Sequence, residues 1–398
     1  MLKGMISLEL KTKIDFYYVF WEVGRRITFN YHIPLLLKDG TILLYNQDTI
    51  SLLSKSLHYE TLFSFKGNED KKEISIIRNI KQIECGDILC CNKKLYIFNL
   101  KSKTKTPKII DIPNDENLCD IIELRNKQLL GITKNSIIEI KKIWNNNKNE
   151  EEYEINIIFK IPEKYIETPI TEKEKKNNTF IQYLNIYELV NKRILIHSYS
   201  TQLIYRRCGT HPPGELCVNN IYIFDLNNKE IIHCFESFVD EANIIILEKY
   251  ICISYSYIID IYDISNYKLL KTIKDKFNKN YIIKYNENII IGLSDEEKNN
   301  DIIIYNLLDI NDIKYNIFRG NFMKFKEMKY NHVYTVRRVK NKTICFLNNN
   351  CIFIACHGKA FIVEMKENIN FINFHPLKEI EYTKEEIDEM ESFESIYI

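Results

Sequence analysis

Glycine and proline are scarce in this chain of 398 residues, which contains 11 glycines and 8 prolines. So few glycines leave little room for the loops that hold nucleotide phosphates, and the patterns G-x-x-x-x-G-K-[ST] and G-x-G-x-x-G are absent. The patterns G-x-S-x-G and H-E-x-x-H of hydrolases are also missing. These absences argue against an enzyme, although a catalytic site assembled from residues far apart in the chain remains an alternative.

Long apolar runs and an excess of charge of either sign are missing as well. The chain has 55 Lys plus Arg against 54 Asp plus Glu. This balance argues against binding to nucleic acid or to an anionic membrane surface. No uncharged apolar run approaches about 18 residues, and the N-terminal segment lacks the features of a secretory signal. We therefore expect no membrane-spanning segment and a cytoplasmic protein, with the nucleus as the alternative.

The 11 cysteines are scattered along the chain without a compact framework, and their number is odd. This pattern favours free thiols in a reducing compartment over a set of disulfides. Most of these cysteines are therefore expected to act as small buried hydrophobic residues. No cofactor is expected.

Residues that favour β-strands dominate the composition. The chain contains 26 Tyr and 21 Phe, and 45% of its residues are hydrophobic, with isoleucine especially common. Ile, Val, Phe and Tyr fit a pleated, half-buried surface, and apolar stripes with a helical period are nearly absent. The sequence therefore predicts an all-β protein.

One unit recurs along the chain: a short polar turn, an apolar pair, and then an alternating strand of the form I-x-I-[FY]. Seven copies are visible, and their apolar pairs begin at Ile42, Ile88, Leu129, Ile194, Ile251, Ile289 and Ile352. The steps between these positions are 46, 41, 65, 57, 38 and 63 residues. The short steps match the roughly 40–45 residues of a four-stranded propeller blade, and the long steps contain insertions. Within each copy, the apolar pair and the alternating segment are interpreted as the second and third strands of a blade.

The phrases IYIFDL, IIDIYDI and IIIYNL resemble the third strand and following turn of WD40-type repeats, with Phe or Tyr in place of Trp. Asp225 and Asp263 occupy the Asp position of that motif, and Asn99 and Asn306 replace it in two other copies. The Gly-His and Trp-Asp pairs of well-formed repeats are absent, so the resemblance is to a degenerate WD40-like family. It implies a seven-bladed β-propeller with four-stranded antiparallel blades, formed as one domain by residues 1–380.

A closed ring buries the apolar faces and the edges of small sheets in one step. Two segments are candidates for the strand that closes the ring, one within Ser7–Phe20 and the other Ile369–Phe374. The sequence leaves both open. The acidic tail, residues 381–398, contains Thr383 followed three residues later by Glu386, a pattern that predicts a short C-terminal helix; a disordered tail is the alternative.

Two insertions break the repeat. Residues 141–178 are rich in charge and asparagine, so we expect a solvated loop with Glu154–Ile161 returning as a strand; a docking segment for a partner is the alternative. Residues 200–220 separate the second and third strands of the fourth copy. This insertion contains two glycines and two prolines within six residues, so it is expected to form a defined turn.

Residue types that bind metal ions or phosphate groups occur together in the second insertion. Cys208, His211 and Cys217 are weak candidates for a zinc site, because two thiolates and an imidazole fill three corners of a tetrahedron; a fourth ligand is not evident. Arg206 and Arg207 resemble part of the Arg-Arg-Gly motif by which phosphoinositide-binding propellers hold lipid headgroups. Two guanidinium groups suit phosphate, but Cys208 interrupts the motif.

The sequence thus favours a non-catalytic scaffold that binds other proteins, within a multi-subunit assembly. A rigid surface loses little conformational entropy on association. The partner contacts are hypothesised at Arg206, Arg207, His211 and Glu215. Two alternatives remain: a phosphoinositide-binding propeller that uses Arg206 and Arg207, and a propeller enzyme with its site in the central channel.

Overall fold

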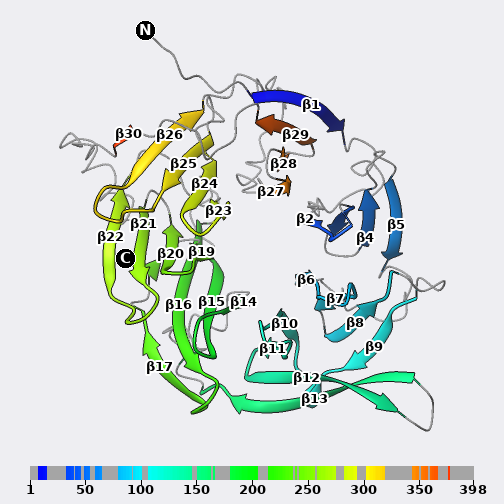
Figure 1. The fold of residues 1–398 in the computed structure, drawn as a ribbon. Coiled ribbons are helices and arrows are strands. Elements are labelled where there is room, and N and C mark those ends of the chain that lie inside the picture. The colour runs from blue at the N-terminus through cyan, green and yellow to red at the C-terminus, as the bar shows by residue number, and fades with distance from the viewer. Residues whose placement is uncertain are drawn as a thin grey trace.

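Small β-sheets surround a central axis in the structure, which is a computed structural model (Figure 1). It describes residues 8–15, 33–39, 41–45, 49–53, 59–64, 79–91, 93–100, 106–145, 150–162, 165, 180–204, 214–235, 238–239, 242–255, 258–274, 282–293, 302–318, 343–348, 351–356, 359–365 and 375–376. These residues contain strands, one short 3-10 turn, η3 (Pro113–Asp115), and no α-helix. The all-β prediction is confirmed for them. The helix predicted in residues 381–398 lies outside the described residues.

The described strands form seven antiparallel sheets, which we number along the chain. Sheet 1 contains β2 (Ile33–Leu36), β3 (Ile42–Tyr45), β4 (Thr49–Leu53) and β5 (Tyr59–Ser64). Sheet 2 contains β6 (Asn79–Gln82), β7 (Ile88–Cys91), β8 (Lys94–Phe98) and β9 (Lys108–Asp111). Sheet 3 contains β10 (Leu118–Glu123), β11 (Leu129–Thr133), β12 (Ser136–Asn145) and β13 (Glu150–Lys160).

Sheet 4 contains β14 (Phe180–Glu188), β15 (Arg193–Ile204), β16 (Gly214–Asp225), β17 (Glu230–Cys234) and the short β18 (Phe238–Val239). Sheet 5 contains β19 (Ala242–Ile246), β20 (Tyr250–Tyr255), β21 (Ile258–Asp263) and β22 (Leu269–Lys274). Sheet 6 contains β23 (Ile282–Lys284), β24 (Ile289–Leu293), β25 (Ile302–Asn306), β26 (Lys314–Phe318) and β30 (His375–Pro376). Sheet 7 contains β27 (Thr343–Asn348), β28 (Cys351–Cys356), β29 (Lys359–Met365) and β1 (Leu8–Asp15).

Each predicted repeat coincides with the second and third strands of one sheet. The apolar pairs that begin at Ile42, Ile88, Leu129 and Ile289 start β3, β7, β11 and β24, and the other three pairs begin at the second residue of their strands. The first strand of each sheet lies nearest the axis (Figure 1). The repeat found in the sequence is therefore confirmed as the repeat of the structure.

Both faces of the second strands are buried, because each sheet packs between two neighbours. In β7, Leu89 and Cys91 pack against sheet 3, whereas Ile88 and Cys90 pack against sheet 1. Successive side chains of a strand point to opposite faces, and all four are at most 1% exposed. Similar cores fill the spaces between sheets 3 and 4, 4 and 5, and 5 and 6. This packing explains why the second strands contain apolar runs such as ILCC in β7.

Strand β1 joins the two ends of the ring. It pairs antiparallel with β29, from Leu8 opposite Met365 to Asp15 opposite Lys359, and so forms the outer strand of sheet 7. The inner strands β2 of sheet 1 and β27 of sheet 7 contact each other. The closing strand is therefore the segment within Ser7–Phe20. The alternative, Ile369–Phe374, lies outside the described residues.

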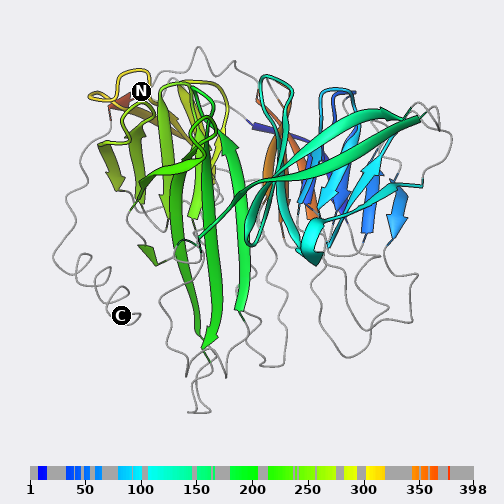
Figure 2. The ribbon, with the colours of Figure 1, turned by 90° about the horizontal axis from the view of Figure 1, so that it is seen from below.

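Two hairpins are much longer than the rest. The pairing of β12 with β13 continues to Asn145 opposite Glu150, so the first part of insertion 141–178 is a hairpin and not the solvated loop expected, and its return strand begins four residues before Glu154. The pairing of β15 with β16 continues to Ile204 opposite Gly214. These two strands extend sheet 4 away from one face of the ring (Figure 2).

The two aspartates at the WD40 Asp position cap the turns that follow the third strands. Asp225 Oδ1 accepts hydrogen bonds from the backbone N–H groups of Asn228 and Asn227, at 3.2 and 2.8 Å, and these bonds lower the pKa of its carboxyl group. Asp263 Oδ1 accepts hydrogen bonds from the hydroxyl and the backbone N–H of Ser265, which lower its pKa in the same way. These aspartates therefore fix the local turn conformation.

A buried histidine makes the stability of sheet 4 depend on pH. His197 on β15 lies with Nε2 2.9 Å from Oδ1 of Asn219 on β16, and burial lowers the pKa of its imidazole to about 4. The pKa in the unfolded chain is about 6.5. The unfolded state therefore takes up a proton first as the pH falls. We expect the free energy of unfolding to decrease by roughly 1 kcal/mol per pH unit between about pH 6 and pH 4.

Urea unfolding at pH 7.0, 5.5 and 4.5 measures this effect. His197→Leu removes the titrating group, so its free energy of unfolding should change less between these pH values than that of the wild type. Other titrating groups are common to both proteins and cancel in the comparison. The same pH dependence in both proteins would show that His197 is not responsible.

Candidate interaction surface

The hairpin of β12 and β13 projects from the rim of the ring beside sheet 2, and both views show it there (Figures 1 and 2). We call the described residues 141–145 and 150–160 of this hairpin the arm. Tyr153 and Ile155 pack against the core between sheets 2 and 3. The hydroxyl of Tyr153 donates a hydrogen bond of 3.3 Å to Asp87 Oδ2, and the ammonium group of Lys142 lies 6.0 Å from the centroid of the Tyr153 ring. The arm is therefore held against the neighbouring sheet.

Large apolar side chains are exposed toward the end of the arm. Ile143 and Trp144 on β12 are 41% and 56% exposed. Ile157 on β13 and Ile109 on β9 of sheet 2 are exposed as well. Among the described residues, β13 pairs with β12 alone, so it forms the outer edge of sheet 3. An exposed tryptophan on a fixed strand is the type of residue that dominates the binding energy of protein interfaces.

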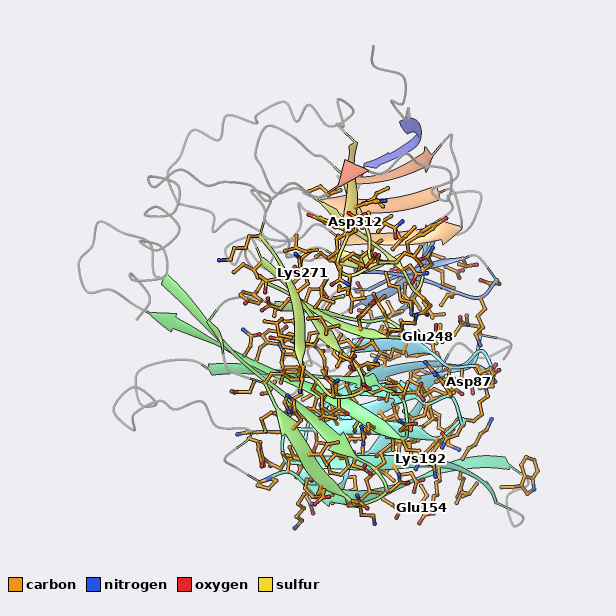
Figure 3. The ribbon with its side chains drawn as sticks, turned by 60° about the vertical axis from the view of Figure 1, so that its left-hand side comes forward. Asp87, Glu154, Lys192, Glu248, Lys271 and Asp312 are labelled. Carbon is orange, nitrogen blue, oxygen red and sulfur yellow. The ribbon has the colours of Figure 1, made fainter. Side chains whose placement is uncertain are left out.

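Neighbouring sheets are joined by hydrogen bonds at the turns between first and second strands. We call the side of the ring with these turns the turn face; Figure 3 labels Asp87, Lys192 and Glu248 from it. Each of three acceptor side chains ends a first strand and binds a backbone N–H of the preceding sheet. The bonds run from Lys38 N to Gln82 Oε1 (2.8 Å), from Glu84 N to Glu123 Oε2 (2.6 Å) and from Arg125 N to Glu188 Oε1 (2.9 Å).

Sheets 5 and 6 are joined by a variant of this bond. Glu287 Oε2 accepts a hydrogen bond of 2.6 Å from the backbone N–H of Glu248, and its other oxygen lies 2.5 Å from Lys284 Nζ. Burial opposes the ionisation of Glu287, but the hydrogen bonds from Lys284 and Glu248 keep the pKa of its carboxyl group below the usual value. Charge-assisted bonds of this kind are stronger than neutral ones, so they fix neighbouring turns relative to each other.

A buried carboxylate connects the first strands of sheets 2, 3 and 4. Asp120 on β10 accepts hydrogen bonds at Oδ1 from Asn79 Nδ2 of β6 (2.6 Å) and at Oδ2 from the backbone N–H of Ile186 on β14 (3.0 Å). Lys81 Nζ of β6 lies 2.9 Å from Oδ1. Both carboxylate oxygens are thus engaged by neighbouring sheets. We assign Asp120 a structural role in spacing the inner strands.

Only one of the four residues proposed from the sequence as partner contacts, Glu215, is among the described residues. Arg206, Arg207 and His211 are outside the described residues, and so is Cys208. Glu215 and Cys217 belong to β16, where their backbones are opposite Leu203 and Thr201. The described residues contain no group of three or more metal-binding side chains. These hypotheses therefore stand as predictions.

Sequence reasoning missed the hydrogen bonds between the sheets, although a signal for them exists. Gln82, Glu123 and Glu188 each stand six residues before the apolar pair of their repeat, and each is followed by a buried Ile or Leu. The shared offset becomes visible when the repeats are aligned on those pairs. The arm carried no comparable signal, because its charged and asparagine-rich sequence resembles a solvated loop.

No protein-family model matches the sequence, and no curated protein matches it. Solved structures do match. The Neurospora crassa Pan2 WD40 domain has a TM-score of 0.53 at 8% sequence identity, over 93% of this chain and 100% of that domain. BamB from Moraxella catarrhalis has a TM-score of 0.45 at 9% identity, over 91% and 99%. Dihydro-heme d1 dehydrogenase NirN has a TM-score of 0.47 at 10% identity, over 88% of this chain and 66% of that chain.

The arrangement of the sheets and the likeness to the Pan2 domain define a WD40-like β-propeller. Phe or Tyr stands where WD40-type repeats carry Trp. These sequence identities are too low to assign the activity of any of these proteins to this chain. Among the described residues, no helix is long and apolar enough to cross a membrane.

Proposed function

We propose that this protein is a non-catalytic scaffold that binds other proteins through surfaces fixed on a closed, seven-bladed propeller. The proposal takes the seven sheets as the complete set of blades, within one domain of residues 1–380 followed by an acidic tail of residues 381–398. It places the protein in the cytoplasm, inside a multi-subunit assembly, without a cofactor. The observation that carries it is the arm, which presents Ile143 and Trp144 to solvent on strands held against sheet 2.

The rigidity of the surface supports this role. The bond between Tyr153 and Asp87 holds the base of the arm, and bonds such as those accepted by Glu123 and Glu188 hold the turn face. A surface that is already fixed loses little conformational entropy when a partner binds, so more of the contact energy is kept as affinity. The insertion with Arg206, Arg207, His211 and Glu215 is proposed as a second contact region.

Trp144→Ala is expected to lower the recovery of partners at least 10-fold. Truncation of a central tryptophan at an interface typically costs about 2 kcal/mol or more, which corresponds to a roughly 30-fold loss of affinity. The measurement is quantitative affinity purification of the full chain, with each recovered protein compared between the wild type and the variant. Because Trp144 is exposed, the variant should unfold at the same urea concentration as the wild type.

Leu308→Ala is the matched control, since Leu308 is 72% exposed and lies in the turn between β25 and β26 of sheet 6, away from the arm. Proteins recovered with the wild type and with Leu308→Ala, but lost with Trp144→Ala, are partners of the arm. A variant with residues 205–213 shortened tests the second contact region in the same experiment. Equal recovery of every protein by all three variants and the wild type would contradict the proposed function.

A further inference from the structure

A cavity of about 410 Å³ lies on the turn face between sheets 3 and 4. It is formed by the turn after β10 and the turn after β14, and Leu124, Leu189, Val190 and Leu226 supply its apolar walls. Cavities of roughly 300–1,000 Å³ are typical of ligand-binding sites. The volume is therefore sufficient for one or two side chains of a bound segment.

Three cations line the same cavity: Arg125, Lys192 and Arg193. The acidic residue in its lining, Glu188, already accepts a hydrogen bond from the backbone N–H of Arg125 and lies 3.8 Å from its Nε. Glu188 thus offsets one of the three positive charges, and the ion pair of Arg193 with Asp225 offsets a second. The cavity combines apolar walls with a net positive rim.

Arg193 is held in position by contacts on the side of sheet 5. Its Nη1 donates a hydrogen bond of 2.9 Å to the hydroxyl of Tyr267, and its guanidinium lies 5.9 Å from the centroid of that ring. Asp225 Oδ2 forms an ion pair with its Nε at 3.7 Å. Arg193 therefore supports the turn after β14, which leaves Arg125 and Lys192 at the rim of the cavity.

The backbone beside Arg193 is a tight hairpin turn between β14 and β15. Asn191 and Lys192 have φ values of 59° and 55°, as the two central residues of a type I′ turn require, and the backbone N–H of Arg193 donates a hydrogen bond of 3.3 Å to the carbonyl of Val190. The conformation holds Lys192 at the rim of the cavity.

We infer that this cavity binds a short segment of a partner protein in which an aliphatic side chain stands next to Asp or Glu. The aliphatic side chain enters the apolar walls, and the carboxylate pairs with Arg125 and Lys192 at the rim. This site is separate from the arm, and the inference does not depend on the function proposed for Trp144.

Fluorescence anisotropy of the full chain with two fluorescein-labelled pentapeptides tests the inference. The probes are the diacid Leu-Asp-Leu-Asp-Leu and its uncharged analogue Leu-Asn-Leu-Asn-Leu. The diacid is expected to bind at least 10-fold more tightly than the analogue. Combining Arg125→Gln with Lys192→Asn should remove this preference, because asparagine keeps the left-handed conformation while the two charges are lost.

Two further variants separate the cavity from general surface charge. Lys271→Gln with Lys274→Gln removes the same charge from β22, and Lys271 lies on another side of the molecule (Figure 3). This pair should leave binding of the diacid unchanged. Val190→Trp fills the cavity without a change of charge and should weaken both peptides at least 10-fold. Unfolding in urea confirms that each variant is folded.

Equal affinity of the wild type for the two peptides, or failure to bind either below about 1 mM, would overturn the inference. So would unchanged binding of the diacid by Val190→Trp. Trp144→Ala should bind the diacid as the wild type does, which distinguishes a failure of this site from a failure of the arm.

Discussion

Removal of residues 1–15 is expected to cost on the order of 5 kcal/mol of stability, enough to leave a large fraction of the chain unfolded. The removed segment contains β1, which supplies the outer strand of sheet 7 and pairs with β29 from Leu8 to Asp15. Each backbone hydrogen bond contributes about 1 kcal/mol net, and a whole protein is stable by only about 5–15 kcal/mol. The loss also separates the chain end from the ring and exposes the edge of β29 to solvent.

Circular dichroism and urea unfolding measure this loss, with removal of residues 381–398 as the control. The acidic tail follows every strand of the described sheets. Its removal should therefore leave the midpoint of unfolding within error of the wild type. A chain without residues 1–15 that unfolds at the wild-type midpoint would show that β1 does not close the ring.

Asp120→Ala is expected to lower the free energy of unfolding by about 3–5 kcal/mol, the cost of breaking a buried charge pair by removing one partner. The substitution leaves the amide of Asn79 and the backbone N–H of Ile186 without their acceptor, and the ammonium group of Lys81 without its counter-ion. Because these groups come from sheets 2 and 4, and Asp120 itself from sheet 3, the substitution disturbs three sheets. Urea unfolding of the full chain gives the difference.

Asp111→Ala provides the matched comparison. Asp111 also forms an ion pair, with its Oδ1 2.7 Å from Lys94 Nζ, but its side chain is 82% exposed. Exposed pairs contribute at most about 1 kcal/mol, because water screens them. If Asp120→Ala costs no more than Asp111→Ala, the buried carboxylate does not hold the inner strands together.

The sequence identified the second and third strands of every sheet, and the physical reason is their burial on both sides. A strand such as β7, ILCC, shows its burial in its own residues, so it can be recognised without its neighbours. The roles of Asp225 and Asp263 can also be recognised from adjacent residues, because each aspartate accepts hydrogen bonds from the turn that directly follows it. The strand repeat could therefore be predicted from short-range pattern alone.

The closing strand and the contacts between sheets could not be predicted in this way. Pairing of β1 with β29 joins residues more than 300 positions apart, and neither segment carries a mark of the other. Asp120 stands in the apolar strand LCDIIE, where nothing local shows which sheets supply its partners. The end of the arm is exposed to solvent, as its charge suggested, but its strand pairing and the bond from Tyr153 to Asp87 of the neighbouring sheet were not predicted.

A cysteine cross-link between β1 and β29 tests the closed ring most directly. The chain with Leu10→Cys and Val363→Cys places two thiols at directly opposite positions, where the Cα atoms of antiparallel strands are about 5 Å apart and a disulfide fits. Leu10→Cys with Phe361→Cys is the control, since diagonal neighbours are roughly 7–8 Å apart. After mild oxidation, peptide mapping should show a disulfide between positions 10 and 363 within one chain, in much higher yield than the control link. Absence of that disulfide, or equal yield of the two links, would contradict a ring closed by its N-terminal strand.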